Sequence, residues 1–147
     1  MFSIGVMATS GDGWAVDTSV AVAALDASHV AHVLCKGVVR ERRPALAGHA
    51  AFETYAVLTR MPGLLVIDGP IAADVIRRVF PSIAWLATDR AAELVRRLGI
   101  LGVTGGSVYD ALVGEAASSN GLRLLTRDLR ARRTYDLLGV DFELVGV

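Results

Sequence analysis

The stretch that decides the fold, residues 109–128, reads YDALVGEAASSNGLRLLTRD. Its first half has the residue spacing of a helix, which we expect Ser107 to cap and which should end near Ser119. The Asn-Gly pair at positions 120–121 signals a turn, and the apolar run Leu122–Thr126 predicts a buried strand. The stretch therefore reads as one helix–strand unit of an α/β protein.

Elements of the same two kinds alternate along the rest of the chain. The apolar run Trp14–Val16 predicts a first strand, and Thr18 and Ser19 are expected to cap the helix that follows it. Thr88 is expected to cap another helix, and residues 82–86 should form a short strand or a loop. Further strands are expected over 45–50 and 140–145, and helices over 20–25, 29–40, 51–60, 71–80, 89–98 and 130–138, with stop signals at 61–63 and an apolar run over 64–67. This alternation predicts an α/β fold of three layers, in which a central, mainly parallel sheet carries helices on both faces.

The composition limits the class of protein. The chain has 147 residues and a mass of 15.5 kDa, which is the usual size of one domain. Hydrophobic residues make up 53% and the mean hydropathy is +0.49, yet the longest stretch without a charged residue runs only from Leu98 to Tyr109. A spanning helix needs about 20 apolar residues, so no membrane segment is expected. Residues 1–13 lack a basic residue and are expected to be a poorly ordered extension rather than a secretory signal, which leaves residues 14–147 as the domain.

Charge and cysteine usage narrow the class further. Fifteen Lys and Arg residues balance fifteen Asp and Glu residues, so no net field draws the chain to nucleic acid. A contact with nucleic acid would need a local basic patch; the arginines at 127, 130, 132 and 133 could supply one, although a solvated helix face explains them nearly as well. Cys35 is the sole cysteine, which excludes an intrachain disulfide and favours a cytoplasmic protein.

Acidic residues follow two of the predicted strands. Asp17 comes directly after Trp14–Val16, and Asp128 comes just after Leu122–Thr126. In parallel α/β sheets the functional crevice lies beyond the carboxyl ends of the strands. Either residue could instead cap the next helix, a role worth about 1 kcal/mol. Two such residues after buried strands favour a functional site.

Two further acids lie near the starts of predicted helices. Glu53 and Asp110 are set among apolar residues, where an unpaired carboxylate is costly to bury. Each could instead complement the positive end of its helix dipole. Thr18 and Thr126 could orient a carboxylate or a water, with capping and strand-end packing as the alternatives. His49 precedes Glu53 and could approach the same cleft, or be a satisfied histidine at a strand end.

Converging carboxylates repel one another unless they bind a cation. Carboxylate and water oxygens suit Mg²⁺ or Mn²⁺, and such an ion lowers the pKa of a bound water and stabilises charge on a phosphate. Metal-assisted phosphodiester hydrolysis is therefore the chemistry that this set of acids predicts. We expect Asp17 and Asp110 to hold the ion, with help from Asp128 and Glu53.

Three segments resemble the PIN domain family, and most closely its VapC toxin branch. Residues 16–20 read VDTSV and are similar to the opening motif of that family. Residues 52–60, FETYAVLTR, are similar to its middle helix, and residues 109–128 to its second half. The resemblance extends over residues 16–145. It places the acids of the family on Asp17, Glu53, Asp110 and Asp128, and the hydroxyl before the last acid on Thr126.

The resemblance implies an endoribonuclease that uses Mg²⁺ or Mn²⁺ and cleaves structured RNA such as tRNA or rRNA. It also implies a homodimer that is inhibited by a VapB-type antitoxin, with no membrane partner. The four acids and Thr126 would be catalytic, and the four acids would be the metal ligands.

Two alternatives to this interpretation stay open. One is a non-catalytic PIN-like module that acts as a scaffold or through its antitoxin complex; loss of an acid would favour it, and none is lost. The other is a phosphoryl-transfer domain, either a receiver or a phosphatase of the haloacid-dehalogenase type. The phosphatase pattern needs a second Asp where this chain has Ser19, and the receiver pattern needs a late lysine, whereas the only lysine is Lys36.

Overall fold

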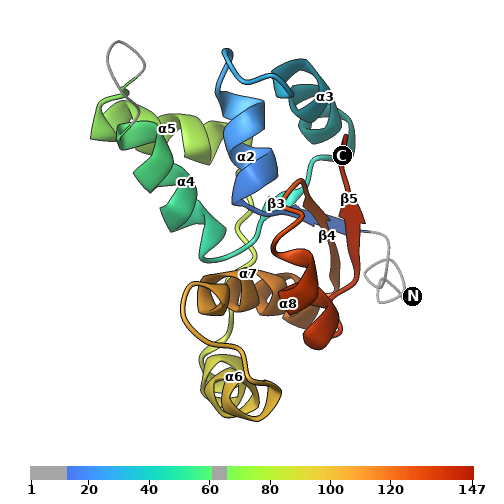
Figure 1. The fold of residues 1–147 in the computed structure, drawn as a ribbon. Helices are drawn as coiled ribbons and strands as arrows, with labels where there is room; N and C mark the ends of the chain where they lie inside the picture. Colours follow the sequence, from blue (N-terminus) through green and yellow to red (C-terminus); the bar gives the residue numbers. More distant parts are fainter. Residues whose placement is uncertain (1–12, 61–65) are drawn as a thin grey trace, which may run out of the picture.

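Four parallel strands form a single sheet in the order β3-β2-β4-β5 (Figure 1). The computed structural model describes residues 13–60 and 66–147. Every neighbouring pair of strands is parallel, and Leu46 forms one further parallel bridge with Ile83. The strands are β2 (Gly13–Val16), β3 (Ala45–Leu46), β4 (Leu122–Thr126) and β5 (Phe142–Leu144).

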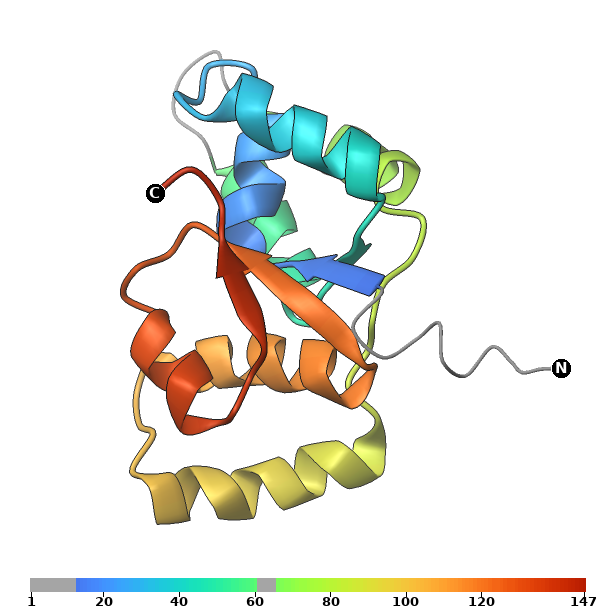
Figure 2. The same cartoon turned by 90° about the vertical axis from the view of Figure 1, so that its right-hand side faces the viewer.

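Helices cover both faces of this sheet, which confirms the predicted three-layer α/β/α architecture (Figures 1 and 2). One face carries α2 (Thr18–Leu25), α3 (His32–Arg42), α4 (Ala50–Thr59) and α5 (Gly69–Val79). The other face carries α7 (Ser107–Ser119) and α8 (Arg132–Leu137), with α6 (Thr88–Leu101) packed on the outer side of α7. Within the described residues, no helix is both long enough and apolar enough to cross a membrane.

The buried sheet accounts for much of the apolar composition. Ala15 and Val16 of β2 and Leu124 and Leu125 of β4 have no solvent exposure. Helices lie over both faces of these strands, so their side chains are apolar on both sides rather than alternating with polar ones.

Some predicted boundaries are wrong for local reasons. The strand expected over 45–50 ends at Leu46, because Gly48 turns the chain with a φ of +47° and α4 begins at Ala50. The strand expected over 140–145 is confined to β5, and α3 begins at His32 rather than at residue 29. Residues 61–63, part of the apolar run over 64–67, and residues 1–12 of the expected extension lie outside the described residues, while Gly13 begins β2.

Two of the expected helix caps are also wrong. Thr88 and Ser107 are the first residues of α6 and α7, and the cap positions belong to Ala87 and Gly106. Neither cap makes a side-chain hydrogen bond. The N-termini of these two helices therefore lack a side-chain cap.

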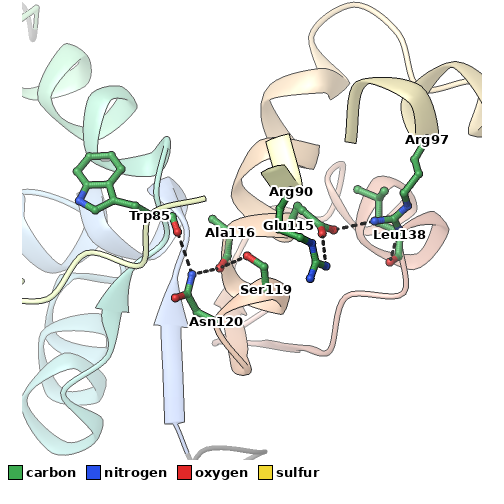
Figure 3. A network of polar contacts seen from close by, with 8 residues as sticks. All are labelled: Trp85, Arg90, Arg97, Glu115, Ala116, Ser119, Asn120 and Leu138. Carbon is green, nitrogen blue, oxygen red and sulfur yellow. Dashed lines mark hydrogen bonds and ion pairs between the residues drawn. The ribbon is translucent and has the colours of Figure 1, made fainter. Parts of the chain in front are cut away.

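One buried carboxylate holds α6 and the end of α8 against α7 (Figure 3). Glu115 of α7 is 2% exposed, and its two oxygens accept from Arg90 at 2.8 Å and from Arg97 at 3.1 Å. Arg97 also donates to the carbonyl of Leu138 at 3.4 Å. Because both oxygens have a cationic partner, the burial cost of this carboxylate is offset. The network fixes the helix that carries Asp110.

A glycine allows α7 and α8 to approach closely. A Cβ on Gly114 would lie 2.8 Å from Cγ2 of Val140 and 3.1 Å from Cδ1 of Tyr135. Both distances are shorter than ordinary van der Waals contact. Tyr135 can therefore occupy its position only because residue 114 has no side chain.

We expect Gly114→Ala to lower the free energy of unfolding by about 1–3 kcal/mol, because the new methyl group overpacks the α7–α8 contact. Gly99→Ala is the matched control, since a Cβ on this exposed helical glycine meets nothing within 4 Å. It should be stabilising by up to about 1 kcal/mol through helix propensity. Urea unfolding measures both variants, and equal effects of the two would contradict the packing argument.

Candidate active site

The register of the sheet brings the first and last predicted acids to one edge. β2 and β4 are parallel with Val16 opposite Leu125, and the backbone N–H of Asp17 donates to the carbonyl of Leu125 at 3.2 Å. Asp17 and Asp128 therefore both follow the carboxyl ends of neighbouring strands, as predicted.

Asp17 is the most completely hydrogen-bonded of the four acids. It is 4% exposed and caps α2. Its Oδ1 accepts from the backbone N–H groups of Ser19 and Val20 at 3.0 and 3.3 Å, and from the Ser19 hydroxyl at 2.5 Å. Its Oδ2 accepts from the hydroxyls of Thr126 and Tyr135, the latter at 3.0 Å. An ionised carboxyl offers about four lone-pair sites, so these five donors occupy all of them.

The prediction that Thr18 and Ser19 cap α2 is wrong, because both lie in its first turn and Asp17 is the cap. Each has another role. The Ser19 hydroxyl, besides donating to Asp17, accepts from the backbone N–H of Arg127 at 2.8 Å. The Thr18 hydroxyl donates to Oε1 of Glu53 at 2.8 Å. These two hydroxyls connect α2 to the segment after β4 and to α4.

Burial and hydrogen bonding act in opposite directions on Asp17. Burial raises the pKa of Asp17, the hydrogen bonds from Ser19, Thr126 and Tyr135 lower it, and burial prevails. Burial also raises the pKa of Tyr135, and the negative charge of Asp17 adds to this effect. Tyr135 therefore keeps its proton and remains a donor to the carboxylate.

The other three acids lie around Asp17. Glu53 is in the first turn of α4, Asp110 is in the first turn of α7, and Asp128 follows β4. The pKa of Asp110 is raised to about 6, first by burial and then by the negative charges of Asp128, Glu53 and Asp17. The fold thus brings the four predicted acids into one electrostatic neighbourhood.

Asp128 performs two tasks, and Thr126 connects it to Asp17. The Oδ1 of Asp128 accepts from the backbone N–H groups of Arg130 and Ala131 at 2.9 and 3.3 Å. These bonds close the turn before α8, whose N-cap residue is Ala131, so the alternative that Asp128 caps this helix is wrong. Its own N–H donates to the Thr126 hydroxyl at 3.0 Å, and that hydroxyl donates to Asp17. The side chain of Asp128 remains 32% exposed, so these bonds do not bury it.

The donor chemistry of this cluster fits a hard divalent cation, because all four side chains are carboxylates and their mutual repulsion raises a pKa. In their present positions, however, the four side chains do not form a metal-binding site. Among residues 13–60 and 66–147, no set of three or more His, Cys, Asp or Glu side chains could hold an ion as they stand. Binding would therefore require side-chain rotation by the partly exposed acids, since Asp17 is held by its five donors.

Sequence reasoning missed Tyr135 and the supporting role of Ser19. Tyr135 is 1% exposed and looks like a core residue in the sequence. Its hydrogen bond to Asp17 spans 118 positions along the chain and depends on the close approach of α8 at Gly114. The one feature of the sequence that pointed to it was an aromatic residue with a hydroxyl group on the predicted helix after Asp128.

We expect Tyr135→Phe to lower the free energy of unfolding at pH 7 by about 1–2 kcal/mol, because the buried Asp17 loses one donor. Tyr109→Phe is the matched control, since this tyrosine is 51% exposed, and it should stay within about 0.5 kcal/mol of the wild type. Chemical denaturation provides the measurement. If the two variants were equally stable, the hydroxyl of Tyr135 would have no role in holding the carboxylate.

The raised pKa of Asp110 predicts how the free energy of unfolding depends on pH. Its pKa is 3.8 ordinarily and about 6 in the folded protein, so the folded state binds this proton more tightly than the unfolded chain. The resulting stabilisation is fully present below about pH 4 and is lost as the pH rises through about 6. In the presence of a chelator, Asp110→Asn should therefore raise the free energy of unfolding at pH 8 by about 1–2 kcal/mol, after discounting for partial exposure, and change it little at pH 4.

Urea unfolding at the two pH values tests this, with Asp136→Asn as a control at an exposed acid. A stability difference between Asp110→Asn and the wild type that is the same at pH 4 and pH 8 would contradict the raised pKa.

Comparison with known proteins agrees with this fold. Residues 15–137 match the model of the PIN domain family. The chain is 43% identical over 126 residues to ribonuclease VapC27 of Mycobacterium tuberculosis (strain ATCC 25618 / H37Rv), covering 86% of this chain and 92% of that protein. It is 44% identical over 135 residues to ribonuclease VapC40 of Mycobacterium tuberculosis (strain CDC 1551 / Oshkosh), covering 89% and 98% of the two chains. The chain thus belongs to the PIN domain family.

Proposed function

We propose that this protein is a metal-dependent endoribonuclease toxin of the VapC type. The observation that carries the proposal is the shared electrostatic neighbourhood of the four acids, in which Asp128, Glu53 and Asp17 each raise the pKa of Asp110. Such a cluster is suited to binding a divalent cation, and a cation bound there would promote hydrolysis of a phosphodiester. The relatives VapC27 and VapC40, both named ribonucleases, support RNA as the substrate.

The carboxylates would hold Mg²⁺ or Mn²⁺ with unequal freedom. Asp110, Asp128 and Glu53 are only partly buried and can rotate toward an ion. Asp17 is held by five donors and would bind the ion only by giving up one of them. When bound, such an ion supplies charge stabilisation at the phosphate and a water of lowered pKa.

The other groups of the site orient these acids. Thr126 donates to Asp17 and accepts from the N–H of Asp128, so one hydroxyl sets the relative position of two acids. Thr18 donates to Glu53 and fixes one of its oxygens. The N-terminal ends of α4 and α7 carry Glu53 and Asp110, and the positive ends of these helix dipoles favour a phosphate beside the acids.

The RNA target, the inhibitor and the oligomeric state are inferred from the resemblance to the VapC branch of the family. We infer a structured RNA such as tRNA or rRNA as the target, a VapB-type antitoxin as the inhibitor, and a homodimer as the working form. The names of VapC27 and VapC40 support the toxin–antitoxin assignment. Pull-down with a co-expressed antitoxin and sedimentation of the purified chain would address the partner and the dimer.

We expect Asp110→Asn to reduce RNA cleavage more than about a hundredfold, which exceeds what residues that only support metal ligands contribute. Its fold should be retained because Asp110 is partly exposed and makes no ion pair among the described residues. Asp110 is a cleaner target than Asp17, whose five donors would meet an amide group in Asp17→Asn. Cleavage of labelled total RNA, followed on gels, is the measurement.

Asp136→Asn is the matched control and should cleave at the wild-type rate. A chelator should abolish wild-type cleavage, and Mg²⁺ or Mn²⁺ should restore it. If Asp110→Asn cleaves RNA normally with metal present, the proposed site is wrong. If the pure wild-type protein neither cleaves RNA nor inhibits growth, the chain acts as a scaffold instead.

A further inference from the structure

Four aromatic rings lie in a continuous row outside the acid cluster. We call Trp85, Phe52, His49 and Tyr109 the aromatic row. The ring centroids of Trp85 and Phe52 are 5.6 Å apart, and those of Phe52 and His49 are 6.1 Å apart, both tilted. His49 stacks on Tyr109 at 5.3 Å with an interplanar angle of 17°. These separations are those of interacting aromatic pairs.

Three of the four rings are exposed and His49 is half-buried, although aromatic rings contribute most to stability when they are buried. Phe52 is 61% exposed, Trp85 is 52% exposed and Tyr109 is 51% exposed. A single exposed ring needs no explanation, but a contiguous exposed apolar surface marks a binding site.

The backbone under the row is fixed by close contacts. A Cβ on Gly48 would lie 2.9 Å from Cβ of Ala116 and 3.2 Å from the carbonyl oxygen of Ala84, so the turn before His49 packs tightly on α7 and on the segment after α5. Asn120 donates to the carbonyl of Trp85 at 3.1 Å, while the indole ring points away from this contact (Figure 3). The rings are therefore presented by an ordered surface, which lowers the entropy cost of binding.

The row borders the acids along the chain. Phe52 directly precedes Glu53 in the first turn of α4, and Tyr109 directly precedes Asp110 in the first turn of α7. His49 is the N-cap residue of α4. Three of the four rings thus lie at two helix N-termini, where the dipoles favour anionic groups, and Trp85 lies in the segment between α5 and α6. A ligand that carries both flat rings and phosphates matches this combination better than an apolar protein surface does.

We propose that the aromatic row is a stacking platform for unpaired bases of an RNA strand whose backbone passes the acid cluster. The proposal rests on the proposed function and adds to it the surface that would hold the bases next to the cleaved bond, namely the aromatic row. Proteins that recognise single-stranded RNA commonly stack its unpaired bases on aromatic side chains. Such stacking contributes about 1–3 kcal/mol per base and is tolerant of sequence.

The test is the binding of a fluorescent single-stranded oligoribonucleotide to the full chain at fixed salt, with a chelator present so that no cleavage occurs. The wild type should bind this strand more tightly than a duplex of the same length. Phe52→Ala and Tyr109→Ala should each weaken single-strand binding by roughly 5- to 150-fold, the range that corresponds to one stacked base. Tyr109→Phe should restore it, and Val95→Ala, at an apolar position 70% exposed on α6, should change nothing.

Two further readouts separate stacking from phosphate binding. An abasic strand of the same length should bind the wild type and the two ring variants equally. The chain has two tryptophans, and the other one, Trp14, lies under the Arg42 guanidinium at 4.2 Å. Binding of the base-carrying strand should therefore quench the tryptophan emission of the wild type through Trp85, and Trp85→Phe should lose most of that quenching.

Two results would overturn the proposal. One is single-strand binding that is absent in the wild type or unchanged in both ring variants. The other is a change in sedimenting mass in these variants without a change in RNA affinity, which would make the row a protein contact. Cleavage by Asp110→Asn at the normal rate would defeat the proposed function alone, because the stacking test measures binding without cleavage.

Discussion

The structure depends on the burial of one carboxylate, that of Asp17. An ionised group that is 4% exposed is costly unless its oxygens are satisfied, and here five donors satisfy them. Those donors come from α2, from the end of β4 and from α8, so a single side chain fixes three elements around the end of β2. Because the partners of this carboxylate lie at the carboxyl edge of the sheet, the same bonds that hold the fold also place the site.

This arrangement divides the acids into one anchor and three adjustable groups. Asp17 cannot move without losing hydrogen bonds, whereas Glu53, Asp110 and Asp128 are partly exposed and repel one another, as the raised pKa of Asp110 records. Mutual repulsion of this kind lowers the stability of the fold, and it is typical of sites where the charges take part in binding or catalysis. The aromatic rings next to Glu53 and Asp110 are likewise unfavourable in the free chain, because they expose apolar surface to water.

The sequence predicted the parts of this structure that depend on local pattern. The end of α7 at Ser119 and the strand Leu122–Thr126 were placed correctly, because an apolar periodicity and a turn at Asn120 mark their limits. The strand expected over 45–50 was too long, because the chain turns at Gly48, where a side chain would meet the distant residue Ala116.

Contacts between distant residues escaped prediction. Thr18, Ser19 and Asp17 are all good capping residues, so propensity alone could not choose among them. The four acids could be named, but their distances, the bond from Tyr135 and the row of rings depend on how the layers pack.

The most direct test of the central claim is a calorimetric titration of Mn²⁺ into the purified chain without RNA. The account predicts saturable binding that is lost in Asp110→Asn and kept in Asp136→Asn, with both variants folded by circular dichroism. Equal binding in Asp110→Asn and in the wild type, or no binding in the folded wild type, would contradict it.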